Sequence, residues 1–217
     1  MNFLEFKNRF LTSIILFLIV FLIIKSNFFL IYAVIIFAVL SLIEFFNLTK
    51  RAIKTNFIKI LSNSIFLIYL SLFSIIFSYF AIYIQTKIIL FILLFGCVGS
   101  DIGGYIFGKI FKGPKLTKIS PKKTISGSIG SFFFTFLIIG SLMFFLTNKI
   151  DLEILFLSIA TSFACQIGDL FFSFLKRKAK IKNTGNFLPG HGGILDRLDG
   201  ILLGIPVGYL ILIFMKV

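Results

Sequence analysis

The residues best suited to chemistry lie between 169 and 199, where the chain reads DLFFSFLKRKAKIKNTGNFLPGHGGILDRLD. On a helix that turns by about 100° per residue, Asp169, Ser173, Lys176 and Arg177 share one stripe. The stripe carries a carboxylate, a hydroxyl and two cations out of an apolar run. Because charged groups facing lipid are costly, it predicts a water-filled pocket at the edge of a membrane.

A glycine-rich stretch follows and ends in acidic residues. Glycines let a backbone approach phosphate closely, and the stretch contains Gly192 and Gly193 next to His191. Carboxylates are hard oxygen ligands of the kind that Mg²⁺ takes together with substrate phosphates. The candidates for metal ligands are Asp169, Asp196 and Asp199. An exposed ion pair between Asp196 and Arg197 is the alternative, but the glycine-rich stretch, Asp169 and the cationic stripe all point to phosphate and metal chemistry.

A second polar constellation begins inside another apolar run. Asp101 lies in that run, where a carboxylate usually faces a cavity or a partner, and a structural hydrogen bond would also satisfy it. Gly99 and Gly103 are four residues apart, as are Gly104 and Gly108. Small residues at this spacing allow two helices to pack closely, so the glycines predict helix packing first.

A basic loop follows this run and reads SPKKT from Ser120 to Thr124. Two ammonium groups, two hydroxyls and the glycines at 127 and 130 could surround a polyphosphate. The loop alone fits a solvated basic segment equally well. Its candidate binding residues are Lys122, Lys123 and Thr124.

Composition indicates that these groups are positioned by a membrane protein. The chain is 59% hydrophobic, with 32 Phe and no Trp, whereas soluble domains are roughly 45–50% apolar. The net charge of +14 comes from basic residues between the apolar runs, which favours phosphates and lipid headgroups over nucleic acid. With one histidine and no CxxC spacing, Cys97 and Cys165 are expected to be packing residues.

Seven apolar segments are long enough, or nearly so, to cross a bilayer. No A-x-A-like cleavage site follows the first segment, so we expect an uncleaved membrane helix there. The third segment is long enough to hold two short helices instead of one. The segments run roughly 10–24, 28–47, 57–84, 88–111, 126–147, 152–175 and 200–215.

Loop charge distinguishes between these two possibilities for the third segment. With seven spans, 18 Lys and Arg lie on the side of the N-terminus and 4 on the other side. Splitting the third segment would change the division to 9 against 13. The positive-inside rule favours the first division. We therefore expect an all-α, polytopic bundle with the N-terminus and the basic loops 109–125 and 176–199 in the cytoplasm.

The stretch from Ser173 to Asp199 resembles the phosphatidate cytidylyltransferase (CDP-diacylglycerol synthase) family. It matches that family's pattern S-x-hydrophobic-K-R-x4-K-D, small residue, Pro, H-G-G-hydrophobic-x-D-R-hydrophobic-D, with Asn183 in place of Asp. Upstream, Asp101 to Tyr105 resembles the family's D-x-G-x-Y, and Ser120 to Thr124 its S-P-x-K-T. Ser126 stands where the family usually has Glu.

The resemblance implies that CMP is transferred from CTP to phosphatidic acid with release of pyrophosphate, using Mg²⁺ and allowing a second cation. It implies catalytic roles for Asp169, His191, Asp196, Arg197 and Asp199. It implies substrate contacts from Asp101, Lys122, Lys123, Thr124, Ser173, Lys176, Arg177, Gly192 and Gly193.

The resemblance also bears on organisation. We expect a single membrane domain over 1–217, with membrane helices of weak resemblance over 1–95 and a catalytic half over 96–217. The partners are CTP, phosphatidic acid and the bilayer of the inner cell membrane, with no nucleic acid; a homodimer is left open. A CTP-dependent kinase of a polyprenol and an ion-coupled transporter are the alternatives, because both would use basic loops or buried acids.

Overall fold

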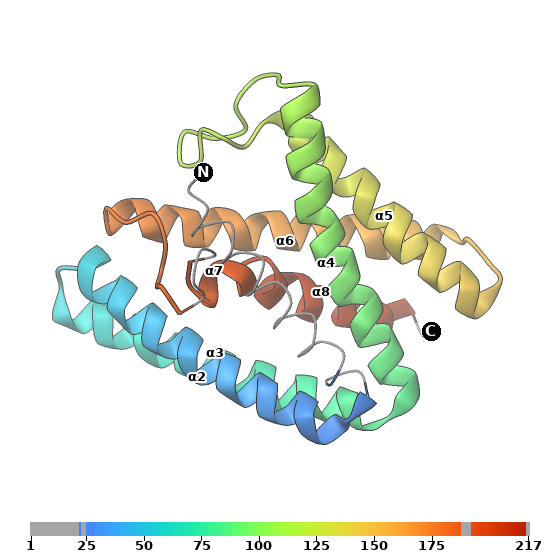
Figure 1. The fold of residues 1–217 in the computed structure, drawn as a ribbon, viewed down its shortest axis with the longest axis horizontal. Coiled ribbons are helices and arrows are strands. Elements are labelled where there is room, and N and C mark those ends of the chain that lie inside the picture. Colours follow the sequence, from blue (N-terminus) through green and yellow to red (C-terminus); the bar gives the residue numbers. More distant parts are fainter. Residues whose placement is uncertain (1–21, 23–24, 188–191, 216–217) are drawn as a thin grey trace, which may run out of the picture. The chain divides into compact units, whose positions relative to one another are not determined.

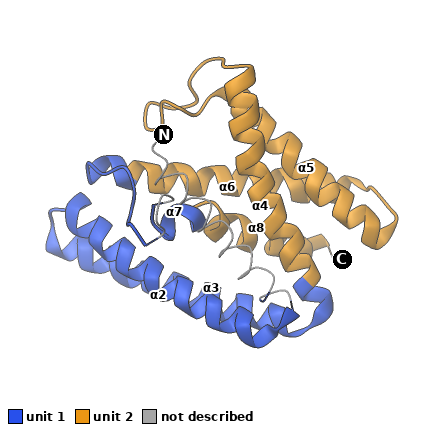
Figure 2. Cartoon of the chain, in the orientation of Figure 1, with its two compact units in different colours: residues 1–87, 175–198 blue, residues 88–174, 199–217 orange. Residues whose placement is uncertain are grey.

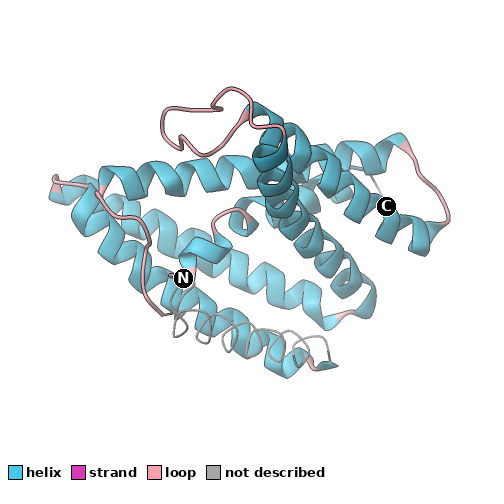
Figure 3. Cartoon of the chain, turned by 45° about the horizontal axis from the view of Figure 1, so that its top comes forward, coloured by secondary structure: helices cyan, strands magenta, loops and turns pink. Residues whose placement is uncertain are grey.

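The computed structural model describes residues 22, 25–187 and 192–215. Within these ranges the chain is helical, and the extended pairing is limited to one bridge between Lys115 and Thr124 (Figure 3). In chain order the helices are α2 (Asn27–Ala52), α3 (Asn56–Ile82), α4 (Ile84–Ile110), α5 (Ile125–Thr147), α6 (Leu152–Lys178), α7 (Leu195–Leu198) and α8 (Ile201–Met215) (Figure 1).

Six helical stretches in the described part are long and apolar enough to cross a membrane, the last of them formed by α7 and α8 together. They coincide with the last six apolar segments of the sequence, so the prediction of an all-α, polytopic bundle is confirmed. The third predicted segment forms one helix, α3, as the loop charges indicated. The first predicted segment, 10–24, lies outside the described residues.

The chain divides into two compact units, coloured separately in Figure 2. Unit 1 comprises residues 1–87 and 175–198, and α2 packs against α3 within it. Stacked rings join Phe45 to Phe66 at 3.9 Å between centroids, and Thr49 donates to the Asn63 Oδ1 atom at 2.7 Å. Lys50 and Arg51 end α2, where cations interact favourably with the helix dipole.

Unit 2 comprises residues 88–174 and 199–217, and small residues bring its helices together. A Cβ atom on Gly103 would clash with the backbone oxygen of Gly130, and one on Gly130 would lie 2.6 Å from the backbone oxygen of Gly103. The backbones of α4 and α5 are therefore in direct contact. The sequence prediction that these α4 glycines serve helix packing is confirmed.

The interior of unit 2 also contains satisfied polar groups. The hydroxyls of Ser100 and Ser162 share a hydrogen bond of 3.1 Å, and Gln166 donates to the Ser162 hydroxyl at 3.3 Å. Such bonds hold membrane helices together at modest energy. Cys97 and Cys165 are buried without a disulfide and lie against Gly204, which fits the packing role predicted for them.

Candidate functional site

Two clusters of acids and lysines bring predicted site residues together, one cluster in each unit. In unit 2, the Lys123 Nζ atom lies 2.9 Å from the Asp169 Oδ2 atom. Their side chains are 30% and 18% exposed, so both remain open to solvent or a ligand. The sequence marked both residues as candidates, and the structure shows that the basic loop and the α6 carboxylate meet.

The basic loop between α4 and α5 is built from its own backbone. Lys112 and Gly113 both have positive φ values, 53° and 80°, which turn the chain as α4 ends. Leu116 then donates to the backbone oxygen of Lys123 at 2.8 Å. The Thr124 hydroxyl accepts from the Gly127 backbone N–H at 3.1 Å and so caps α5. The loop thus doubles back and presents Lys123 beside α6.

A close crossing in unit 2 brings together two of the predicted metal ligands. A Cβ atom on Gly168 would clash with the backbone oxygen of Asp199, and one on Gly200 would lie 3.1 Å from the Asp169 Oδ1 atom. The start of α8 therefore lies directly against α6 at Asp169. Asp101 belongs to the same unit and is exposed on α4.

The second cluster lies in unit 1 and is centred on Asp196. The Lys176 Nζ atom lies 2.7 Å from the Asp196 Oδ1 atom, with side chains 14% and 11% exposed. The Asp196 Oδ2 atom accepts from the backbone N–H groups of Thr184, at 2.8 Å, and Gly193, at 3.1 Å. A carboxylate held by a cation and two backbone donors is tightly oriented.

Glu44 of α2 is the residue that sequence reasoning did not assign to the site. Its side chain is 1% exposed and accepts hydrogen bonds from Thr184, Ile194 and Leu195, all in unit 1. The available signal was an acid inside the apolar stretch LIEFF. An acid so placed is costly and usually functional.

The other predicted residues on α6 and α7 are half-buried or exposed. Ser173 is half-buried on α6, and Arg177 is exposed near the end of that helix. The end is marked by Lys180, whose φ of 56° is left-handed and whose N–H donates to the Arg177 carbonyl. Arg197 is exposed on α7. His191 lies outside the described residues.

Carboxylate donors in this chain fit a hard divalent cation by their chemistry. Asp169 and Asp199 lie at one crossing in unit 2, and two carboxylates plus substrate phosphates are typical of Mg²⁺. Asp196 already uses both oxygens, so a cation there would take the place of Lys176. Among the residues that the structure describes, no three His, Cys, Asp or Glu side chains are grouped as a metal site.

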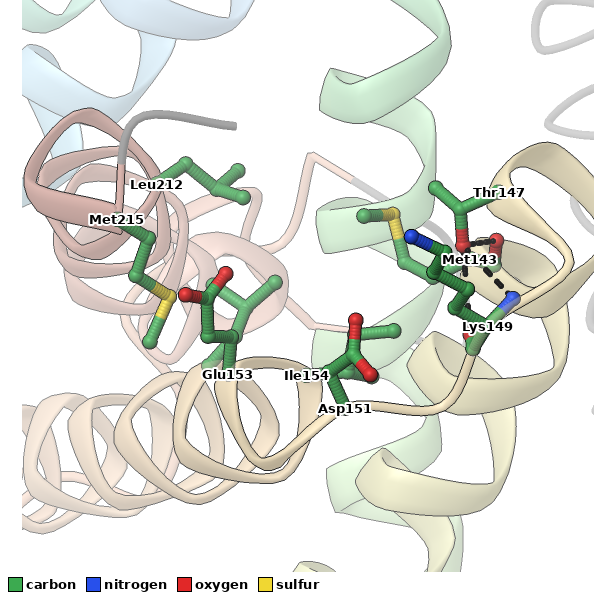
Figure 4. A pocket seen from close by; sticks show the side chains of 9 residues that line it. Met143, Thr147, Lys149, Asp151, Glu153, Ile154, Leu212 and Met215 are labelled. Atoms are coloured by element: carbon green, nitrogen blue, oxygen red, sulfur yellow. Dashed lines mark hydrogen bonds between the residues drawn. The ribbon is translucent and has the colours of Figure 1, made fainter.

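Unit 2 also has a cavity of about 240 Å³ at the opposite ends of α5 and α6 from Thr124 and Asp169 (Figure 4). Its lining includes Lys149, Asp151 and Glu153 beside apolar side chains of α5 and α8. None of the site residues that were predicted from the sequence lines this cavity.

The family model described as "Cytidylyltransferase family" matches residues 7–215. The chain belongs to this family. Cytidylyltransferase membership covers both units and both clusters, including the N-terminal half, where the sequence motifs alone gave little guidance.

Curated relatives show how far the likeness extends. The phosphatidate cytidylyltransferase of Rickettsia bellii (strain RML369-C) is 40% identical over 132 residues, which cover 55% of this chain and 56% of that protein. The one from Rickettsia prowazekii (strain Madrid E) is 41% identical over 140 residues, 58% and 60% of the two chains. The phosphatidate cytidylyltransferase of Staphylococcus haemolyticus (strain JCSC1435) is 40% identical over 118 residues, which cover 54% of this chain and 45% of that protein. The chain thus spans about half the length of the curated relatives it matches.

Proposed function

We propose that this protein transfers CMP from CTP to phosphatidic acid and releases CDP-diacylglycerol and pyrophosphate. The observation that carries the proposal is the match to the cytidylyltransferase family over residues 7–215, strengthened by relatives named phosphatidate cytidylyltransferase. The acid–lysine clusters support it, because each offers cations for phosphate next to carboxylates that orient them.

The reaction needs no nucleophile from the protein. An oxygen of the phosphatidate headgroup forms a bond to the α-phosphorus of CTP, while the bond from that phosphorus to the bridging oxygen breaks. Pyrophosphate leaves with that electron pair. The attacking oxygen is already largely ionised at neutral pH, so the protein has to position two polyanions and neutralise their charge.

We assign CTP to the basic loop of unit 2. Lys122 is exposed and Lys123 is half-buried beside Asp169, so either ammonium group can reach a polyphosphate arriving from the cytoplasm. Thr124 contributes mainly through the cap that fixes the end of the loop. Asp101, on α4 of the same unit, is assigned to the same substrate.

We assign the phosphatidate headgroup to the cationic end of α6, with Ser173, Lys176 and Arg177. The acyl chains remain in lipid, so the phosphate has to lie at the membrane edge where α6 ends. Gly192, Gly193 and His191 are proposed to approach the reacting phosphates, with Arg197 stabilising the charge that develops there.

The carboxylates of Asp169, Asp196 and Asp199 are proposed as Mg²⁺ ligands, with a second cation allowed. When bound, the metal neutralises charge on the attacking and leaving oxygens. Asp169 also orients Lys123 through their 2.9 Å contact, so this carboxylate would serve the polyphosphate in two ways.

We propose that the loops 109–125 and 176–199 both lie on the cytoplasmic side of the inner cell membrane. The basis is the 18-to-4 division of Lys and Arg between the two sides. Single cysteines at positions 117 and 182, in a chain whose two native cysteines are replaced, should react with an impermeant maleimide only after the membrane is opened. Labelling of intact cells at either position would reverse the orientation and remove access to cytoplasmic CTP.

The deciding experiment is an assay of the purified protein in detergent with CTP, phosphatidic acid and Mg²⁺. We expect CDP-diacylglycerol and pyrophosphate in equal amounts, without a membrane gradient. Formation of CDP and a phosphorylated polyprenol would instead support the kinase alternative. Absence of turnover by well-folded protein with either acceptor would favour the transporter.

A further inference from the structure

A buried carboxylate of α2 contacts the motif loop of unit 1 on both sides of its undescribed centre. We call residues 183–187 and 192–195, the described parts of the motif loop, the glycine loop. We propose that Glu44 is a positioning residue that holds the glycine loop, and with it Asp196, in the geometry needed for the transfer reaction. This inference rests on the proposed function for its kinetic consequence only.

Glu44 satisfies donors from both described parts of the glycine loop. Its Oε2 atom accepts from the Thr184 hydroxyl at 2.8 Å and from the Leu195 backbone N–H at 2.9 Å. Its Oε1 atom accepts from the Ile194 backbone N–H at 3.0 Å. Buried backbone donors need partners, and here one side chain from a distant helix supplies them. Without Glu44, these buried groups would be left unsatisfied.

The shape of the loop is fitted to this carboxylate. A Cβ atom on Gly185 would clash with the Glu44 Oε1 atom and lie 2.8 Å from its carboxyl carbon. A Cβ atom on Gly193 would clash with the Glu44 Oε2 atom and with the Thr184 hydroxyl. These two glycines therefore leave room for Glu44. Sequence reasoning had assigned Gly193 to phosphate contact alone, and packing against Glu44 is a second reason for a glycine there.

Thr184 links Glu44 to Asp196. Its hydroxyl donates to Glu44, and its backbone N–H donates to the Asp196 Oδ2 atom at 2.8 Å. The Asp196 Oδ1 atom then accepts from Lys176. A continuous set of hydrogen bonds thus runs from the buried acid to the proposed phosphatidate-binding cation. Displacing Thr184 would shift the carboxylate that orients Lys176.

The decisive variant is Glu44→Gln, which preserves size and removes charge. Both oxygens of Glu44 accept from N–H or O–H donors, so the amide nitrogen of the substituted side chain would have to face one of those donors. We expect kcat to fall about tenfold or more, while KM for CTP, which the basic loop of unit 2 is proposed to bind, changes less than about threefold. Glu153→Gln, at the exposed start of α6, is the matched control and should behave as wild type.

Two further variants separate positioning from general scaffolding. Thr184→Val removes only the hydroxyl that joins Thr184 to Glu44 and should give an intermediate loss of kcat, whereas Thr184→Ser should restore nearly normal turnover. Hydrogen exchange of the purified proteins gives a readout independent of activity. In Glu44→Gln, the amides of Thr184, Ile194 and Leu195 should exchange faster, with protection in α4 and α5 unchanged.

Wild-type kcat and wild-type exchange in Glu44→Gln would overturn the proposal. Loss of protection throughout the chain, in step with the loss of activity, would also overturn it, because Glu44 would then be a general packing residue. If the wild-type protein makes no CDP-diacylglycerol, the proposed function is wrong. The exchange experiment then decides by itself whether Glu44 holds the glycine loop.

Discussion

The glycine loop and the basic loop are held in contrasting ways. The glycine loop receives a carboxylate, Glu44, from a helix far away in sequence, and a second carboxylate, Asp196, accepts from two of its backbone N–H groups. The basic loop, residues 111–124, is held by its own backbone bonds and by the Thr124 cap. The ion pair that joins this loop to α6, between Lys123 and Asp169, is partly exposed.

This difference suits different tasks. A loop fixed by buried hydrogen bonds keeps groups in place as charge develops, which is how preorganised sites stabilise a transition state. A loop with flexible, half-exposed lysines can adjust to a polyphosphate that arrives from water. The comparison therefore predicts that damage to the glycine loop affects kcat, whereas damage to the basic loop affects KM for CTP.

The largest loss of turnover is expected when either carboxylate that pairs with a cluster lysine is neutralised. Asp169→Asn and Asp196→Asn should each lower turnover about a hundredfold or more, because each loses a proposed metal ligand and the partner of a lysine. Turnover is measured as CDP-diacylglycerol formed by detergent-purified protein. Asp151→Asn, at the other end of α6, is the matched control. Near-normal activity of either variant would remove that residue from the site.

A smaller effect should separate the two substrates. Lys123→Ala is expected to raise KM for CTP about tenfold, and Arg177→Ala to raise KM for phosphatidic acid by a similar factor, because a charge-assisted contact with phosphate is worth about 1.5–3 kcal/mol. Initial rates with each substrate varied in turn provide the measurement. Lys118→Ala and Lys178→Ala are exposed-lysine controls.

If Lys123→Ala instead raised KM for phosphatidic acid, and Arg177→Ala raised KM for CTP, the two subsites would be assigned the wrong way round. Equal effects of both variants on both KM values would mean that the loops share one phosphate site, and the contrast between them would then have no kinetic meaning.

The last effect concerns the stability of the protein where α4 and α5 meet, and not turnover. Gly130→Ala places a methyl group 2.6 Å from the backbone oxygen of Gly103 and should cost about 1–3 kcal/mol, seen as a lower thermal midpoint in detergent. Gly140→Ala is the matched control on the same helix, since its nearest atoms lie at 3.6–3.8 Å. It should be neutral or slightly stabilising. A wild-type midpoint for Gly130→Ala would mean that α4 and α5 separate easily.

The sequence was sufficient to predict the membrane helices, because their signal is local. Hydropathy marked each described span, and loop charge favoured one helix for residues 57–84. The α4 glycines were also readable, since four-residue spacing of small residues predicts close packing. The motifs likewise pointed to the family that the chain belongs to.

The contacts within the site were not predictable, because they depend on tertiary packing. The motif stripe predicted that Asp169 and Lys176 share one face of a helix, but it could not identify their partners: Lys176 contacts Asp196, and Asp169 contacts Lys123. Glu44 had no motif of its own, and its partners are mainly backbone N–H groups, which any residue type other than proline could supply. Roles of these residues in catalysis and metal binding stay predictions.

The hydrogen bonds of Glu44 also have a consequence for the order of assembly during synthesis. Glu44 and Ile194 are 150 positions apart, so at about 5–20 residues per second the ribosome makes the acid roughly 8–30 seconds before its loop partners. During that interval α2 carries an acid whose final donors do not yet exist. The glycine loop can acquire its folded form only after α3 to α6 have been made. Its completion is therefore a late step, and it requires that the intervening helices are already present.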